Sequence, residues 1–159
     1  MEQRLLALSR AYSALRGTVE DVPAAAFLSD VCEPLQTAHI RIKIQTETGL
    51  TVSSGVAPTL GIVVNEAVCN ALKHAFPEQR AGVVKVTLGK RDRHLVLRVS
   101  DDGLGMKPTT TGEGQGQGLM SHLMKSVGGR IELSSRPNEG TTVTAYWPAG
   151  SGRGGDATV

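Results

Sequence analysis

The stretch LGIVVNEAVCNALKHAF, residues 60–76, combines a helical apolar pattern with an unusual number of polar groups. Its apolar residues recur at helical spacing, which predicts a helix over 57–75 that ends before Pro77. Val63, Ala67 and their neighbours form one face of this helix, and that face is expected to pack onto a sheet.

The opposite face carries groups that suit a metal-bound polyphosphate. Glu66, Asn70 and the pair Lys73 and His74 are three or four residues apart, so they share one face of the helix. An amide oxygen is a hard ligand for Mg2+, which usually keeps waters and phosphate oxygens in its shell. A carboxylate can orient or deprotonate a nucleophile, and a lysine can neutralise phosphate charge. Taken alone, the helix is explained equally well by a polar face that only meets solvent.

The composition of the whole chain indicates a single domain. Its 159 residues are 40% hydrophobic, which is enough for a core, and its net charge of +2 makes no case for nucleic acid or an anionic membrane. Cys32 and Cys69 have no metal-ligand spacing, so we expect them to be small buried hydrophobes in a reducing, cytoplasmic setting. No apolar run is long enough to span a membrane, and we expect no membrane contact by this segment.

The order of elements predicts an α/β two-layer sandwich, in which a mixed, mostly antiparallel sheet is covered on one face by helices. Asp21 is expected to cap the second helix and Pro23 to occupy its first turn. Segment 49–54 is expected to be a weak partner strand of 40–44. Strands are predicted at 40–44, 49–54, 83–89, 94–101, 130–135 and 141–148, and further helices at 4–15, 20–35 and 119–127.

Three regions are expected along the chain. Residues 1–18 form a helix that could be the end of a dimerisation segment, which gives a homodimer through this helix as one expectation. Residues 19–148 form the folded domain. Residues 149–159 contain no core-forming side chains and are expected to be a disordered tail.

The segment VSDDGLGM, residues 99–106, places an acid at a strand end. The Asp101 carboxylate can accept a hydrogen bond from a nucleobase amino group, and Gly103 and Gly105 let the backbone come close to a flat ring. An ordinary Asp-Gly turn is the alternative.

The segment GEGQGQGLMSHL, residues 112–123, alternates glycines directly before a helix. Free backbone N–H groups at a helix N-terminus suit phosphate binding, and a linker is the alternative. Gly140 and Thr141 start the last strand, where the hydroxyl could reach a phosphate or a base pocket or could serve only turn chemistry. The chain contains neither a strand–G-x-G-x-x-G–helix unit nor a G-x-x-x-x-G-K-[ST] loop, which argues against a Rossmann fold and a P-loop.

In this order, the four segments resemble the N, G1, G2 and G3 boxes of the GHKL, or Bergerat-fold, ATPases. The matching patterns are N-E-x-x-x-N-A-x-K-H at 65–74, D-x-G-x-G at 101–105, G-x-G-x-G at 114–118 and G-T at 140–141. The resemblance covers about residues 57–148 and implies the Bergerat ATP-binding fold with ATP and Mg2+ as cofactors.

The resemblance also implies a role for each matched side chain. Glu66 would be the general base or a water-orienting acid, and Asn70 would be the Mg2+ ligand. Lys73 would contact phosphate and His74 would lie near the nucleotide. Asp101 would bind the adenine amino group. Thr141 would support the base site, Gly103 and Gly105 would shape the pocket, and Gly114, Gly116 and Gly118 would form a lid over the phosphates.

Within that superfamily, residues 60–78 look most like sensor histidine kinases of the HWE and HisKA-2 type. This implies an ATP-binding catalytic domain of a two-component sensor kinase that transfers the γ-phosphate of ATP to a histidine. The partners implied are a domain bearing that histidine and, indirectly, a response regulator. None of His39, His74, His94 and His122 lies in an acceptor-like context, so the acceptor is expected outside this chain.

Two alternatives remain open at this point. One is an anti-sigma factor with serine kinase activity and the same fold. The other is a degenerate domain that acts only as a scaffold, which the retention of Glu66, Asn70 and Asp101 disfavours.

Overall fold

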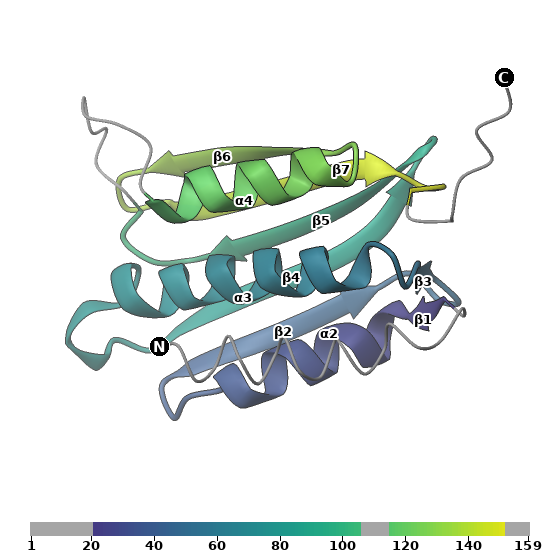
Figure 1. Ribbon diagram of the computed structural model, residues 1–159. Helices are drawn as coiled ribbons and strands as arrows, with labels where there is room; N and C mark the ends of the chain where they lie inside the picture. The colour runs from purple at the N-terminus through teal and green to yellow at the C-terminus, as the bar shows by residue number, and fades with distance from the viewer. Residues whose placement is uncertain (1–20, 106–114, 152–159) are drawn as a thin grey trace, which may run out of the picture.

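The computed structural model describes residues 21–105 and 115–151, and its centre is one five-stranded sheet. The strand order is β2-β4-β5-β7-β6, with β2 and β4 parallel and the other neighbours antiparallel. The α-helices of the described residues all lie on one face of this sheet (Figure 1). The predicted two-layer α/β sandwich with a mixed, mostly antiparallel sheet is therefore confirmed.

The elements of the sandwich follow the predicted order. The sheet is formed by β2 (Ile40–Thr46), β4 (Gly82–Arg91), β5 (His94–Asp101), β6 (Arg130–Arg136) and β7 (Gly140–Pro148), and it is covered by α2 (Ala24–Cys32), α3 (Ala57–His74) and α4 (Gln115–Ser126). Two short 3-10 turns, Glu33–Leu35 and Pro77–Gln79, follow α2 and α3.

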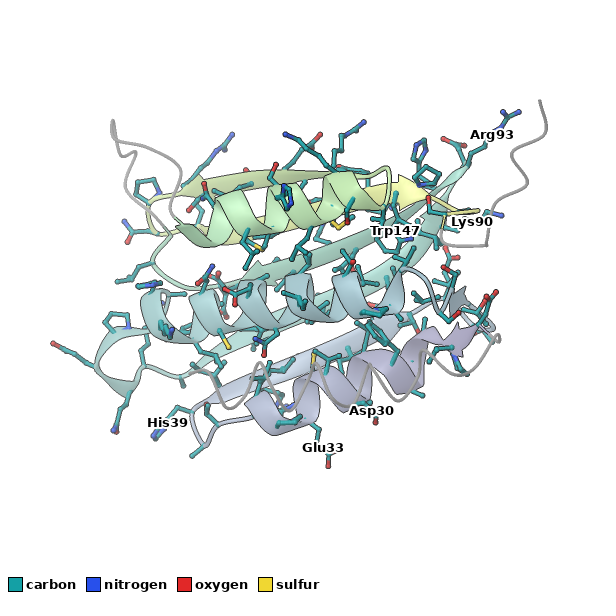
Figure 2. All side chains as sticks on the ribbon, in the orientation of Figure 1. Asp30, Glu33, His39, Lys90, Arg93 and Trp147 are labelled. Atoms are coloured by element: carbon teal, nitrogen blue, oxygen red, sulfur yellow. The ribbon has the colours of Figure 1, made fainter. Side chains whose placement is uncertain are left out.

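The core lies between the sheet and the helices because the strands alternate with period two. Alternate residues in the middle of β4 and β5 are buried, β7 adds Val143, Ala145 and Trp147, and Trp147 is 1% exposed. On the outer side of α2, Asp30 and Glu33 point away from the sheet, while Lys90 and Arg93 flank the β4–β5 turn (Figure 2). Helix α3 lies between α2 and α4 (Figure 1), so apolar residues surround most of it.

The start of α2 differs from the prediction. The helix begins at Ala24, and Pro23 lies one position before it with no side-chain cap, so Asp21 does not cap this helix. Instead, Val22–Pro23 form β1, which pairs antiparallel with β3 (Thr51–Val52) in a separate two-stranded sheet. Asp21 accepts a hydrogen bond from Thr51 Oγ1 at 3.4 Å. The expectation that 49–54 pairs with 40–44 was wrong, because β2 takes β4 as its parallel neighbour.

Helix α4 begins at Gln115, four residues before the predicted start at Leu119. The predicted helix at 4–15 and the region 1–18 lie outside the described residues. Residues 149–151, which we expected to begin a disordered tail, form a turn in which the Ala149 amide donates to Arg93 O at 2.9 Å and Ser53 Oγ donates to Ser151 O at 2.7 Å. The remaining tail residues, 152–159, lie outside the described part.

Both cysteines are free. Burial raises the pKa of the Cys32 thiol to about 12, which keeps it neutral. Cys69 is half-buried and its thiol donates to Asn65 Oδ1 at 3.9 Å. The expectation that Cys32 is a small buried hydrophobe is confirmed.

Substitution of Leu60 tests how much the buried side of α3 stabilises the sandwich. Its side chain is fully buried, so Leu60→Ala should lower the free energy of unfolding by about 2–5 kcal/mol through lost transfer energy and a residual cavity. Leu133→Ala is the matched control, because Leu133 is 42% exposed on β6 and should cost far less. Urea denaturation measures both values, and equal losses would contradict this assignment of the core.

Candidate functional site

Helix α3 includes all four polar residues predicted to share one face. Glu66, Asn70 and Lys73 lie within about 60° of one another around the helix axis, and His74 lies further round. Glu66 and Asn70 are half-buried, and Lys73 and His74 are exposed in the last turn. A cation in the last turn also complements the negative end of the helix dipole, so Lys73 has a structural role besides any role in binding.

Asn65 is a polar residue of this helix to which the sequence assigned no role. Its side chain is only 4% exposed, and its Oδ1 accepts the Cys69 thiol bond one turn later. A polar residue at this depth is retained where it is hydrogen-bonded, and here that bond lies within the helix itself. Its place as the first residue of the N-E-x-x-x-N-A-x-K-H pattern at 65–74 was the sequence signal.

Asp101, the last residue of β5, is the best-fixed polar group in this region. Its Oδ1 accepts the backbone N–H of Gly103 at 3.0 Å and that of Thr141 at 3.3 Å. Oδ2 takes part in neither bond. Burial raises the pKa of the Asp101 carboxyl above its usual 3.8, the neighbouring Asp102 charge raises it further, and the two backbone bonds offset part of the rise.

The segment from Gly103 to Gly105 passes between the C-terminal end of α3 and the β6–β7 turn. The Leu104 amide donates to Ala75 O at 3.0 Å, and Leu104 O accepts the Asn138 amide at 2.7 Å. A Cβ on Gly103 would overlap Ala75. Gly105 has φ +67, and a Cβ there would overlap Arg136 O. The glycines therefore hold three chain segments at backbone contact, and this shapes the surroundings of Asp101.

Thr141 lies beside Asp101. Its amide bonds Asp101, and its hydroxyl is 2.8 Å from Ser135 Oγ on the neighbouring strand. The residue before it, Gly140, has φ +80, and a Cβ there would overlap Asp101 O. A sequence pattern as short as Gly-Thr thus marks the point where β7 approaches the end of β5.

The glycine-rich segment differs from the expected lid. Gly116 and Gly118 belong to the first turn of α4, and Gly114 lies outside the described residues. Gly118 is exposed, with nothing within 4 Å of the position of a Cβ. Helix α4 lies beside α3 (Figure 1), so these two glycines stand near the polar helix but as helix rather than loop.

The polar face of α3 suits a cation that takes most of its ligands from water and phosphate rather than from the protein. Among the described residues, no group of three or more His, Cys, Asp or Glu side chains could hold a metal ion. Mg2+ commonly uses one or two protein oxygens and completes its octahedron with waters and phosphate oxygens. The amide of Asn70, half-buried one turn after Glu66, fits such a partial ligand.

Helices on one face of a mixed sheet, an acid fixed at a strand end and a polar central helix define a nucleotide-binding α/β sandwich. The chain belongs to the family of histidine kinase-, DNA gyrase B- and HSP90-like ATPases, which matches residues 55–151. In the described part of the chain, no helix has the length and apolarity needed to cross a membrane.

Its relatives include sensor histidine kinases. Blue-light-activated histidine kinase 2 of Erythrobacter litoralis is 27% identical over 143 residues, which are 85% of this chain and 41% of that protein. The oxygen sensor histidine kinase NreB of Staphylococcus carnosus is 36% identical over 88 residues, which are 54% of this chain and 24% of that protein. This chain therefore spans less than half of the length of either relative.

Solved structures agree with this family. The histidine kinase domain of the Erythrobacter litoralis EL346 blue-light activated kinase has a TM-score of 0.65 and 25% identity, covering 76% of this chain and 60% of that one. The mycobacterial sensor histidine kinase MprB, at 21% identity, shares the fold with a TM-score of 0.65 and covers 82% of this chain and 97% of that chain. These comparisons give no support to the anti-sigma alternative.

Two glycine substitutions separate close packing from helix propensity. Gly103→Ala should destabilise the domain, because its Cβ would push the segment away from Ala75 and the end of α3. Gly118→Ala should instead stabilise by about 0.5–1 kcal/mol, since the new methyl group stands in open space on a helix. Urea unfolding of both variants measures the two signs, and a stabilised Gly103→Ala protein would refute the packing described here.

Proposed function

We propose that this chain is the ATP-binding catalytic domain of a sensor histidine kinase that transfers the γ-phosphate of ATP to a histidine outside this chain. The observation that carries the proposal is the Asp101 carboxylate, held at the end of β5 by the Gly103 and Thr141 amides next to the C-terminal end of α3. Membership of the ATPase family and the histidine kinases among its relatives support it.

Asp101 would select adenine. Two backbone amides fix Oδ1, so the carboxylate is already oriented and Oδ2 can accept a bond from the 6-amino group of the base. The Gly103–Gly105 backbone would border the base pocket, because its glycines let it pack closely beside Asp101. Thr141 would support the pocket through its amide and through its hydroxyl contact with Ser135.

The polar face of α3 would handle the phosphates. Asn70 would hold Mg2+, which offsets the charge on the phosphate oxygens when it is bound. Glu66, one turn earlier, would accept the proton of the incoming imidazole nitrogen, and Lys73 would stabilise charge that develops on the transferred phosphoryl group. His74 would lie at the edge of the nucleotide, and the segment with Gly114, Gly116 and Gly118 would cover the phosphates.

The placement of the histidines supports a phosphate acceptor outside this chain. The four histidines are exposed and lie before β2, at the end of α3, at the start of β5 and on α4. We assign none of them as the acceptor, so a separate acceptor domain would take the phosphate and pass it to a response regulator. A cytoplasmic setting and a homodimer formed through residues 1–18 belong to the same proposal.

Asp101→Asn tests the adenine site. The Asn side-chain oxygen can still accept the two amide bonds, so the amide NH2 replaces Oδ2 and faces the donor group of adenine. ATP affinity should fall about tenfold or more, and the preference for ATP over GTP should be lost, because the keto oxygen of guanine accepts from an amide donor. Calorimetric titration with both nucleotides measures this, and an unchanged preference would reject the assignment.

The stability of the same variant is a separate readout. The raised pKa of Asp101 means that the folded protein binds this proton more readily than the unfolded chain does, so stability falls as pH rises from 3.8 through the raised pKa. At neutral pH, Asp101→Asn should therefore be at least as stable as the parent protein. A loss of ATP binding through unfolding would show as a lower free energy of unfolding.

Asn70→Ala tests the cation site. The variant lacks the only amide on this part of the α3 polar face. Its ATP affinity in the presence of Mg2+ should therefore fall about tenfold or more. In EDTA, the variant and the parent should bind ATP equally. Thr59→Ala is the control, because Thr59 is a half-buried residue on the same side of α3 three turns earlier. If Thr59→Ala lost the same Mg2+ dependence, Asn70 would not be the ligand.

A further inference from the structure

The face of the sheet opposite the helices carries an excess of positive charge. The alternate strand residues that point away from the core have cationic side chains on four of the five strands, whereas Glu132 is the carboxylate among them. Glu47 also reaches this face, where its carboxylate lies over Gly89. The cationic residues of this face are Arg41, Lys43, Lys85, Arg91, Arg98, Arg130 and Arg136.

A hollow of about 400 Å³ lies on this face at the end where β5 begins and β7 ends. Its volume is within the usual range of small-ligand sites. Val96 lies in the row that joins β5, β7 and β6, where it is in register with Tyr146, and Tyr146 is in register with Arg130. The hollow is lined by Arg91, Asp92, His94, Val96, Arg98, Arg130 and Tyr146.

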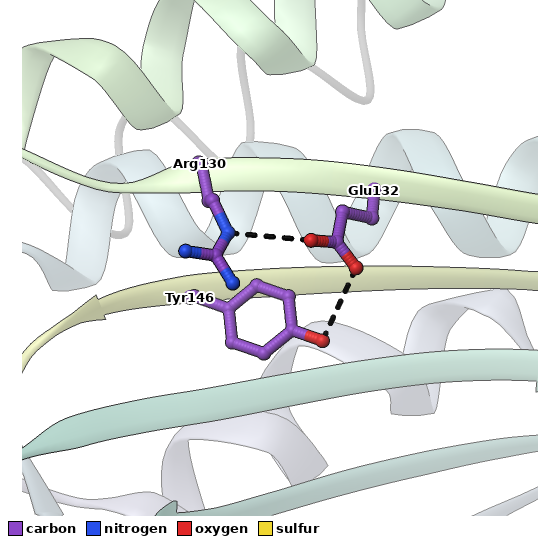
Figure 3. Close-up of polar contacts among 3 residues, drawn as sticks. All are labelled: Arg130, Glu132 and Tyr146. Carbon is purple, nitrogen blue, oxygen red and sulfur yellow. Dashed lines mark hydrogen bonds and ion pairs between the residues drawn. The ribbon is translucent and has the colours of Figure 1, made fainter.

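Arg130 is held in place by its neighbours (Figure 3). Its guanidinium carbon stands 4.4 Å from the centre of the Tyr146 ring, and its Nε is 3.3 Å from Glu132 Oε1. The Tyr146 hydroxyl donates to Glu132 Oε2 at 3.3 Å, which closes the triangle of side chains. Each of these exposed contacts is weak alone, but together they restrict the arginine rotamer.

This arrangement leaves the two Nη atoms of Arg130 available to a ligand. Glu132 engages Nε, whereas the two Nη atoms take part in neither of the contacts drawn in Figure 3. Paired Nη donors match the two oxygens of a carboxylate or a phosphate. Because the side chain is already ordered, less conformational entropy is lost when an anion binds.

Arg98 supplies a second cation from the neighbouring part of the sheet. It lies two residues after Val96 on β5 and is in register with Thr144, which is in register with Glu132. Among the residues that the structure describes, no acid lies within ion-pair distance of Arg98. Asp92, in the β4–β5 turn, is the opposing charge at the rim.

We propose that this hollow is an anion site that takes a phosphoryl or carboxylate group between Arg98 and Arg130, over Val96. The site is distinct from the nucleotide site of the proposed function. Asp101 ends β5 roughly 10 Å along the strand from Arg98 and roughly 16 Å from Val96, and α3 covers the other face of the sheet. Arg91 and His94 also line the hollow.

Amide NMR titration of the full chain with inorganic phosphate and with succinate tests the site. Saturable shifts should centre on Val96, Arg98, Arg130 and Tyr146. Arg130→Gln should raise the dissociation constant about tenfold, while Arg136→Gln should leave it within about twofold. Arg136 is the matched control because it lies on the same strand and is paired with Glu139 at 3.6 Å, outside the hollow.

Asp92→Asn is the variant expected to gain affinity. Asp92 has φ +53, a conformation that asparagine adopts readily, so the turn should be kept while a negative charge leaves the rim. Phosphate should then bind about two- to fivefold more tightly. Tyr146→Phe keeps the ring under Arg130 but removes the bond to Glu132, and it should weaken binding less than Arg130→Gln does.

A phosphoserine tripeptide and inorganic phosphate distinguish the source of the group. Tighter binding of the peptide would assign the site to a modified protein segment, and tighter binding of the free ion would assign it to a small metabolite. Shifts that never saturate, or an equal loss of affinity in Arg130→Gln and Arg136→Gln, would overturn the proposal in favour of diffuse attraction. ATP affinity should be unchanged in Arg130→Gln, which keeps this result independent of the proposed function.

Discussion

The two hydrogen bonds that Asp101 Oδ1 accepts join parts of the chain that are distant in sequence. The bond from Gly103 turns the chain sharply after β5, and the bond from Thr141 ties this turn to the start of β7. The neighbouring Leu104 amide then bonds Ala75 at the end of α3. The half-buried carboxylate therefore joins a strand end to a hairpin, and the adjoining Leu104 bond adds the helix end. The glycines at 103, 105 and 140 are required because these segments are in close contact.

The same carboxylate shows a conflict between stability and recognition. Burial makes the charged form of Asp101 costly, as its raised pKa indicates, and the two amide bonds compensate only in part. A neutral side chain of the same shape would satisfy both amides without this cost. A charge kept at such a position is typical of groups that are selected for binding rather than for folding.

Much of the fold could be predicted because its signals are local. The apolar period of residues 57–75 gave α3 almost to the residue, and alternation gave the strands of the two hairpins. The partner of β2 could not be predicted, because alternation specifies which face of a strand is buried but not which strand lies beside it. The start of α4 was misplaced for another reason: glycines have a poor helix propensity, and tertiary contacts with α3 and the sheet override it.

The candidate site was predicted only where its signals are local in the sequence. Spacing along one helix was enough to group Glu66 with Asn70, and a strand end followed by glycines was enough to single out Asp101. The contact between Asp101 and Thr141 spans 40 positions and has no local signature. The triangle of Arg130, Glu132 and Tyr146 was not predicted either, since it depends on the register of β6 with β7. Side chains that meet across strands become visible only once the register is known.

The parallel pairing of β2 with β4 gives α3 a second role, as the connection that crosses between them. Ile40 pairs with Gly82, 42 positions later, and α3 lies within that loop. The β4–β5 and β6–β7 hairpins close over short distances, so they are expected to form first, while β2 joins the sheet only when the crossover is in place. The helix that presents Glu66 and Asn70 thus lies in one of the two long connections of the sheet, the other being the one that joins β5 to β7. A chain that has not yet paired β2 with β4 has therefore not closed the loop that contains this helix.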